Sequence, residues 1–279
     1  MENNKIVFFG THSYDRHAFT DMNADKNFGF QLIYHRSFLD INNADETHGA
    51  KAVCIFVNDR ADRAVLQKLK DNGVELLALR CAGFNNVDLQ AAKDLGIRVV
   101  RVPAYSPHAI AEHVMALILT LNRKTHRAYS RTRDGNFALH GLMGFDLYGK
   151  TAGVVGTGKI ARVLIGILKG FGMNVVAYDI YEDHEYEKAA GIKYVTMDEL
   201  YAQSDIISLN CPLTPQNRYL INKDSIAKMK KGVMLINTGR GPLINSEDLV
   251  DGLKSGQIGA AGLDVYEEEH DYFYQDRSD

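Results

Sequence analysis

The chain has 279 residues, of which 46% are hydrophobic and 24% charged, with a formal net charge of -3. At about 150 residues per domain, this length predicts two domains with sizeable cores. The composition is typical of a folded globular protein and excludes disordered, collagen-like and small disulfide-stapled chains. No run of Lys and Arg is long enough to follow a phosphate backbone, so we do not expect nucleic acid as a partner.

The three cysteines, Cys54, Cys81 and Cys211, are widely scattered and form neither a disulfide framework nor a metal-binding spacing. We therefore expect a reducing, cytoplasmic location and no metal. The first apolar stretch, Ile6 to Phe9, is too short for the core of a signal peptide. The longest apolar run, Val114 to Leu119, is about a third of the ~18 residues that a membrane span needs, so no membrane partner is expected.

Short runs rich in Val, Ile and Phe alternate with helical patterns, which is typical of parallel strands joined by helices. The predicted fold class is α/β, with two Rossmann-like domains over residues 1–102 and 103–279. In the first domain we expect strands at about residues 5–9, 30–35, 52–56, 75–79 and 97–101. A helix is expected from Ala61 to Asn72, with Asn58 or Asp59 as its N-cap and Gly73 after its end.

Ser106 and Pro107 predict the start of a long helix that runs through Ala109 to Asn122. This helix is apolar on nearly all sides, so we expect it to be buried on several sides, between domains or between subunits. A polar loop is expected from Arg131 to Gly149.

The rest of the chain shows the more regular strand and helix pattern. Strands are expected at residues 151–156, 174–179, 193–195, 205–211, 233–238 and 259–265, and helices at 158–171, 197–204, 223–230 and 246–255. Thr196 with Glu199, and Asn245 with Asp248, have the spacing of capping boxes at two of the helix starts.

A glycine motif of the form G-x-G-x-x-A joins the first of these strands to its helix. Gly156 permits a tight turn, Gly158 lets the backbone approach a pyrophosphate, and Ala161 lets the helix pack closely on the strand. The helix N-terminus offers free N–H groups to phosphates. The motif alone is weak, because a plain glycine turn has the same form.

The next strand ends in Asp179, 21 positions after Gly158, where a carboxylate binds the ribose of a dinucleotide. The alternative is an ordinary turn residue. Because a carboxylate there repels a 2′-phosphate, we expect NAD rather than NADP. Polar groups also follow three later strands, as a ligand site at the sheet's carboxyl edge requires; these segments are Asn210–Thr214, Thr238–Gly241 and Asp264–Glu269.

Together with Arg80–Asp88 and Pro103–His113, these segments resemble the D-2-hydroxyacid dehydrogenase family, above all its fermentative bacterial members. The resemblance covers essentially the whole chain. It implies a substrate domain followed by an NAD-binding domain, and NAD-dependent interconversion of pyruvate and D-lactate.

The resemblance also implies individual roles. Arg240 would bind the substrate carboxylate and polarise the keto group; the alternative is a structural salt bridge. Glu269 would raise the pKa of a catalytic histidine, with Glu267 and Glu268 as local rivals.

Further residues are implied to bind substrate or cofactor. Ala82 and Gly83 would offer backbone N–H groups to the substrate carboxylate, and Tyr105 its hydroxyl, unless Tyr105 simply packs beside Pro103. Lys159 and Ile160 would contact the pyrophosphate. The residues implied to surround the nicotinamide end are Cys211, Pro212, Asn217, Thr238 and Asp264, and the resemblance also implies that Gly239 and Arg240 contact the cofactor. We expect Cys211 to be a small buried hydrophobe rather than a reactive thiol.

In this family the proton donor is a histidine that follows one further strand. The sequence ends at Asp279 before that segment, so we expect an inactive fragment that lacks the family's last strand and C-terminal helix. None of the ten histidines is a convincing substitute: they are His12, His17, His35, His48, His108, His113, His126, His140, His184 and His270. The alternatives are a complete, non-catalytic NAD-binding protein and a reductase of another 2-ketoacid. The full-length form is expected to be a homodimer that pairs through the helix at 109–122.

Overall fold

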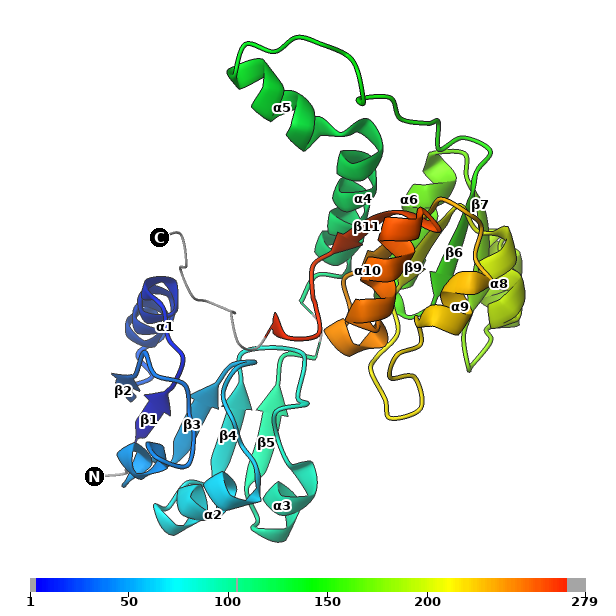
Figure 1. Ribbon diagram of the computed structural model, residues 1–279. Helices are drawn as coiled ribbons and strands as arrows, with labels where there is room; N and C mark the ends of the chain where they lie inside the picture. The colour runs from blue at the N-terminus through cyan, green and yellow to red at the C-terminus, as the bar shows by residue number, and fades with distance from the viewer. Residues whose placement is uncertain (1–3, 104, 270–279) are drawn as a thin grey trace. The chain divides into compact units, whose positions relative to one another are not determined.

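The computed structural model describes residues 4–103 and 105–269. The chain divides into two compact units, Met1–Tyr105 and Ser106–Asp279, and each is described by itself (Figure 1). Both are α/β units built on a parallel sheet, so the predicted fold class is confirmed. None of the helices in the described ranges is long and apolar enough to cross a membrane.

The first unit is built on a five-stranded sheet in the order β2-β1-β3-β4-β5. Its strands are β1 (Lys5–Phe8), β2 (Gln31–Tyr34), β3 (Ala52–Ile55), β4 (Leu76–Leu79) and β5 (Arg98–Arg101). All neighbouring pairs are parallel, so the loops that follow the strands gather at one edge. The strand order reverses between β1 and β3, which is where open α/β sheets bind ligands.

Four helical segments complete this unit: α1 (Ser13–Asp25), the 3-10 helix η1 (Ala44–Thr47), α2 (Arg63–Asp71) and α3 (Leu89–Asp94). The N-cap predicted for α2 was wrong. Asp62 caps the helix by accepting the N–H groups of Ala64 and Val65. Asp59 cannot do so, because its buried carboxylate accepts the N–H groups of Leu39 and Phe56 instead.

The second unit is built on a six-stranded sheet in the order β11-β10-β9-β6-β7-β8, the order of a dinucleotide-binding Rossmann sheet. Its strands are β6 (Thr151–Val155), β7 (Asn174–Tyr178), β8 (Lys193–Tyr194), β9 (Ile206–Leu209), β10 (Val233–Asn237) and β11 (Ile258–Leu263). They pair in parallel throughout. The carboxyl ends of β6 and β9, where the order reverses, therefore lie side by side.

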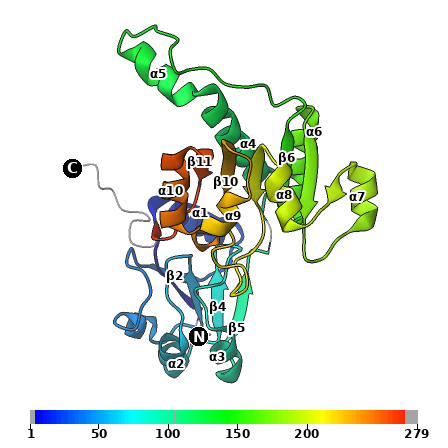
Figure 2. The ribbon, with the colours of Figure 1, turned by 45° about the vertical axis from the view of Figure 1, so that its right-hand side comes forward.

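Helices cover both faces of this sheet (Figures 1 and 2). One face is packed by α4 (Pro107–Arg123) and α6 (Lys159–Gly170), and the other by α8 (Met197–Gln203), α9 (Lys223–Ala227) and α10 (Ser246–Ser255). The connections also hold α5 (Thr125–Arg133), α7 (His184–Ala190) and the 3-10 helix η2 (Gly241–Leu243). Helix α7 was not predicted; Asp183 caps it and Gly191 ends it.

Helix α4 begins as predicted, with the Ser106 hydroxyl accepting the N–H of Ala109 and Pro107 in the first turn. Within its unit it buries one flank, including Val114 and Ile118, against α6 and the sheet. The expected burial on several sides is therefore not found within this unit, where Ala116 on the other flank is exposed.

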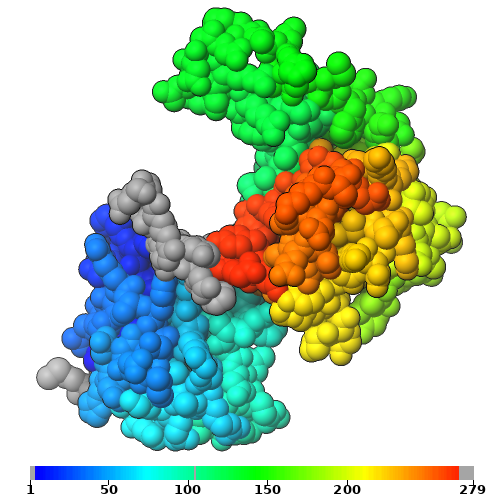
Figure 3. Space-filling view, in the orientation of Figure 1, coloured from blue at the N-terminus to red at the C-terminus, as the bar shows by residue number. Residues whose placement is uncertain are grey.

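The predicted loop at 131–149 begins too early, because α5 continues to Arg133. The left-handed backbone of Lys124 separates α5 from α4. No residue of α5 is buried, and the helix and its following loop stand out from the rest of their own unit (Figures 1 and 3). We call residues 125–146 the arm.

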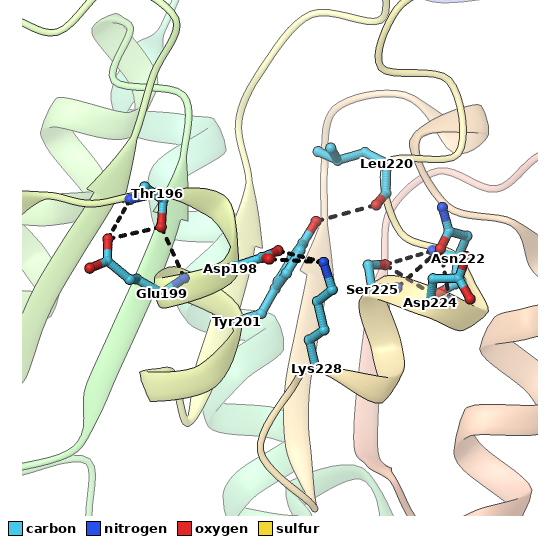
Figure 4. Close-up of polar contacts among 9 residues, drawn as sticks. All are labelled: Thr196, Asp198, Glu199, Tyr201, Leu220, Asn222, Asp224, Ser225 and Lys228. Carbon is cyan, nitrogen blue, oxygen red and sulfur yellow. Dashed lines mark hydrogen bonds and ion pairs between the residues drawn. The ribbon is translucent and has the colours of Figure 1, made fainter.

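Side-chain caps fix several helices of the second unit (Figure 4). Thr196 and Glu199 form the predicted capping box at α8. Asn245 accepts the N–H of Asp248, but the Asp248 carboxylate accepts the N–H of Lys223, so the second predicted box is only a single cap. Lys228, the C-cap of α9, pairs with Asp198 of α8 at 2.7 Å, which joins the two helices.

Candidate functional site

The turn between β6 and α6 brings the glycine motif to the point where the strand order reverses. Gly156 has a φ of +89°, and a Cβ there would lie 2.9 Å from the carbonyl oxygen of Asn210. Only glycine therefore fits between the two strand ends. Ala161 is buried, as close packing of α6 on the sheet requires.

The start of α6 is open to an anion. Gly158 is its N-cap, is exposed, and has nothing within 4 Å of where a Cβ would lie. The N–H groups of Lys159 and Ile160 have no carbonyl one turn earlier in the helix, and no other described group accepts them. A twelve-residue helix with free N–H groups and an unobstructed approach is suited to binding a pyrophosphate.

Asp179 follows β7 and is tied to the glycine turn. Its Oδ2 accepts the N–H of Thr157 at 2.7 Å and the Thr157 hydroxyl at 2.9 Å, and its Oδ1 accepts the N–H of Tyr181. Partial burial opposes ionisation, but these N–H groups outweigh it and hold the pKa of Asp179 below its ordinary value. The side chain is thus a fixed carboxylate beside the glycine turn.

The loop after β9 places Cys211 and Pro212 at the same edge of the sheet. Asn217 ties this loop together by donating to the Pro212 carbonyl at 2.8 Å and accepting the N–H of Thr214 at 2.7 Å. Burial raises the pKa of the Cys211 thiol to about 11, so it is a neutral thiol at physiological pH.

The loop after β10 contains Thr238, Gly239 and Arg240. Buried Asn237 shapes it by accepting the N–H of Gly239 at 3.0 Å and donating to the Arg240 carbonyl at 2.9 Å. The Arg240 guanidinium is half-buried and donates to the Gly239 carbonyl at 2.8 Å. It forms no ion pair with any carboxylate of the described chain, so the alternative of a structural salt bridge is not observed there.

The segment after β11 carries several carboxylates with different partners. Asp264 lies 3.2 Å from Nε2 of His113 on α4. Glu267 accepts the Tyr219 hydroxyl and pairs with Arg218, so its carboxylate is structural. Glu269 accepts the N–H of Tyr266 at 3.3 Å, and Glu268 is exposed.

In the first unit, Ala82 and Gly83 lie in the loop that follows β4. Both are half-exposed, and the N–H groups of both lack an acceptor among the described residues. Two adjacent free N–H groups at the ligand-binding edge are able to receive a carboxylate. Tyr105 is 68% exposed, and its hydroxyl makes no hydrogen bond within the described ranges.

The second unit thus brings together the expected residues that follow β6, β7, β9, β10 and β11 at one edge of its sheet. Residues that were not predicted, Thr157, Asn237 and Tyr219, hold the loops of this edge in place. Thr157 and Asn237 adjoin predicted residues, but their side-chain partners depend on the fold. His270, considered as a substitute proton donor, lies outside the described residues. No group of three or more metal-binding side chains occurs in the described part of the chain.

Comparisons with known proteins identify the family to which the chain belongs. Residues 115–276 match the family model described as "D-isomer specific 2-hydroxyacid dehydrogenase, NAD binding domain". The chain is 53% identical to a 2-hydroxyacid dehydrogenase homolog of Haemophilus influenzae and 51% identical to D-lactate dehydrogenase of Escherichia coli. Each match covers 98% of this chain and 82% of the relative.

The structural matches lead to the same family. The apo-structure of the E. coli D-lactate dehydrogenase matches with a TM-score of 0.87, over 96% of this chain and 84% of the other. D-lactate dehydrogenase from Aquifex aeolicus, solved with NAD and lactic acid, matches with a TM-score of 0.83 at 32% identity, over 95% and 78%. The chain belongs to the D-isomer specific 2-hydroxyacid dehydrogenases, a family of NAD-dependent oxidoreductases, and its second unit contains their NAD-binding domain.

Proposed function

We propose that the protein catalyses the interconversion of pyruvate and D-lactate with NAD. The observation that carries this proposal is the Arg240 guanidinium, which lies at the same sheet edge as the glycine turn and has no carboxylate partner among the described residues. A half-buried, uncompensated cation beside a dinucleotide site favours an anionic substrate. The names of the H. influenzae and E. coli relatives support a 2-hydroxyacid, and that of the E. coli relative supports lactate.

The cofactor would be held by the groups that line the carboxyl edge of the second sheet. The N–H groups of Lys159 and Ile160 would bind the pyrophosphate, with Gly156 and Gly158 allowing its approach, and Asp179 would accept the ribose hydroxyls. The groups assigned to the nicotinamide end are Cys211, Pro212, Asn217, Thr238, Gly239 and Asp264. When bound, NADH supplies the hydride that reduces the keto carbon.

Arg240 would bind the pyruvate carboxylate and draw electron density toward the keto oxygen. Its planar, permanently charged fork suits two oxygens at once, and its only described side-chain bond is to a neutral carbonyl. In the first unit, the free N–H groups of Ala82 and Gly83 would bind the same carboxylate, and the Tyr105 hydroxyl would donate to it.

Reduction also requires a proton at the keto oxygen, and Glu269 is assigned to the histidine that delivers it. Of the three neighbouring glutamates, Glu267 is already bound by Tyr219 and Arg218, so it is the weakest candidate. A carboxylate beside a histidine stabilises the imidazolium and raises its pKa toward neutrality. None of the ten histidines of the 279 residues is assigned to this role, so the kinetic experiments proposed below are made on protein that includes the donor.

We propose that two copies associate through α4 and the arm. Phe137, Leu139 and Met143 of the arm are each more than three-quarters exposed, and the exposed flank of α4 adjoins them in sequence. An exposed apolar segment of this size favours self-association.

The test is NADH-dependent reduction of pyruvate by the purified protein, followed at the nicotinamide absorbance, with NADH binding measured on the same sample. A panel of larger 2-ketoacids supplies the specificity control. Turnover of pyruvate that is faster than turnover of the larger 2-ketoacids supports the proposal. Binding without turnover identifies a nucleotide-binding protein instead, and faster turnover of another 2-ketoacid changes the substrate.

A further inference from the structure

The free N–H groups of Ala82 and Gly83 owe their direction to strand β5. Arg101, the last residue of β5, donates from Nη1 to the carbonyl oxygen of Ala82 at 2.8 Å. The next residue, Val102, donates its N–H to the carbonyl oxygen of Cys81 at 3.2 Å. Both carbonyl groups of the loop are therefore held from the β5 side.

The planar peptide bond transmits this restraint to the N–H groups. In a trans peptide the C=O and the following N–H point in opposite directions. The carbonyl of Ala82 belongs to the same peptide unit as the N–H of Gly83, so the bond from Arg101 turns that N–H away from β5. The bond from Val102 does the same for the N–H of Ala82.

Arg101 is itself held in place, although it is exposed. Its guanidinium lies over the ring of Phe84, 5.2 Å from the centroid, and forms no ion pair with a carboxylate in the described ranges. A cation that donates to a carbonyl oxygen polarises the whole peptide unit, which makes the N–H at its other end a stronger donor. Both orientation and polarity thus favour an anion on the far side of the peptide.

Several bonds besides that of Arg101 hold the loop. Arg80, just before the loop, pairs with buried Asp15 and donates to the carbonyl oxygens of Phe9 and Gly10 at 3.0 Å each. Cys81 adds a bond from its thiol to the carbonyl of Gly83 at 3.2 Å. An exposed bond such as that of Arg101 contributes little to stability by comparison.

We propose that Arg101 is a positioning residue for the 2-ketoacid substrate, which fixes and polarises the Ala82–Gly83 peptide so that the N–H of Gly83 binds the substrate carboxylate. This inference rests on the proposed function, because it takes the carboxylate to be that of the substrate. It extends that function to a residue that does not touch the substrate.

The test compares Arg101→Met, Arg101→Lys and Arg98→Met in the purified protein. Methionine keeps an unbranched side chain beside Phe84 but has no donor, whereas lysine keeps a donor without the planar fork. Arg98 is an exposed arginine at the other end of the same strand and serves as the matched control. The measurements are KM and kcat for pyruvate, the Kd for oxamate in the presence of NADH, the Kd for NADH and the melting temperature.

For Arg101→Met we expect KM for pyruvate and Kd for oxamate to rise about tenfold, the lower end of the range for a lost hydrogen bond to a charged group. The change in kcat should be less than about threefold, because the interaction is made in the ground state and the transition state alike. Arg101→Lys should fall between the wild type and Arg101→Met. Arg98→Met should match the wild type.

Three outcomes would overturn the inference. An unchanged KM and oxamate Kd in Arg101→Met would show that the peptide keeps its orientation without the bond. A higher KM accompanied by weaker NADH binding and a lower melting temperature would show a structural role instead. If the wild type binds NADH but neither reduces a 2-ketoacid nor binds oxamate, the proposed function fails and this inference fails with it.

Discussion

Thr157 in the glycine turn donates both its backbone N–H and its hydroxyl to one oxygen of Asp179, at 2.7 and 2.9 Å. The glycine turn after β6 and the carboxylate after β7 are therefore one hydrogen-bonded unit, although they follow different strands. The second carboxylate oxygen accepts the N–H of Tyr181. Because every one of these bonds favours the charged form, Asp179 presents a fixed negative charge at the end of β7.

Asp179→Asn is expected to weaken NADH binding about tenfold and to abolish the preference for NADH over NADPH. The amide removes the charge that repels a 2′-phosphate and offers one acceptor atom where the carboxylate offers two. Fluorescence titration with both nucleotides measures the two effects. Asp183→Asn is the control, because asparagine still caps α7. A variant that still rejects NADPH would exclude Asp179 as the source of the preference.

The sequence predicted the local structure here, a tight glycine turn after one strand and an acidic residue at the end of the next, because its signals are local. Gly156, Gly158 and Ala161 meet steric needs of a single turn, and Asp179 lies at the end of the next strand. The alternation of strands and helices predicts a parallel sheet, and the polar residues after its strands predict a ligand site at its carboxyl edge. Those same rules placed Cys211 and Arg240 at the correct edge without any knowledge of their contacts.

Features that depend on distant partners were missed for a physical reason. Asp59 has the sequence context of an N-cap, yet the fold buries it under the loop at Leu39. For helix α4, covering of its exposed flank by another domain or subunit stays a prediction, because periodicity records apolar residues and not what packs on them. The role inferred for Arg101 depends on the pairing of β4 with β5, which brings residues 82 and 101 together.

Arg240→Lys is expected to lower kcat/KM for pyruvate about 100-fold, as the loss of one transition-state donor does in other enzymes. NADH affinity should stay within about threefold, since Arg240 is assigned to the substrate and lysine keeps the charge. Steady-state kinetics and NADH titration separate the two effects. Arg218→Lys is the matched control, because Arg218 pairs with Glu267 at the same sheet edge. Equal losses in both variants would argue against a direct role for Arg240.

Asp59 is expected to make the first unit less stable as the pH rises from about 4 to about 6. Burial raises the pKa of Asp59 from 3.8 to about 6, although the N–H groups of Leu39 and Phe56 oppose the shift. Between these values the folded state binds more protons than the unfolded state, so the free energy of unfolding falls as the pH rises through that window and is level above it. The upper limit of the effect is about 3 kcal/mol.

Calorimetric melting of the wild type and Asp59→Asn at several pH values isolates this contribution, since all other carboxylates are common to both proteins. The stability of the wild type relative to the variant should decrease from pH 4 to pH 6 and then stay constant. The two oxygens of Asp59 accept the N–H groups of Leu39 and Phe56, one each. The asparagine amide has only one oxygen and so can accept only one of them. The variant should therefore be less stable than the wild type at low pH. A pH-independent difference would show that Asp59 titrates normally.

Glu267→Gln is expected to lower the stability of the protein, whereas Glu269→Gln is expected to change the pH dependence of its activity. Glu267 is bound by Tyr219, Arg218 and Ser246, so its amide variant should lower the stability by about 1–2 kcal/mol while leaving the pH profile of kcat/KM in place. Glu269→Gln should instead shift the profile for pyruvate reduction to lower pH, because the histidine loses the carboxylate that raises its pKa. Melting curves and pH–rate profiles of both variants test the assignment, and a shifted profile in Glu267→Gln alone would transfer the role to Glu267.

Met143→Glu on the arm is expected to shift the protein from dimer to monomer. Met143 is 86% exposed in the single chain, and a buried, unpaired carboxylate would cost an apolar interface several kcal/mol. Light scattering coupled to size-exclusion chromatography should give twice the mass of one chain for the wild type and the mass of one chain for the variant. Val250→Glu, at an exposed position of α10 in the same unit, is the control and should stay dimeric. Because the arm lies away from the carboxyl edge of the sheet, NADH affinity should be unchanged in both variants. A wild type that is already monomeric would contradict the proposed dimer.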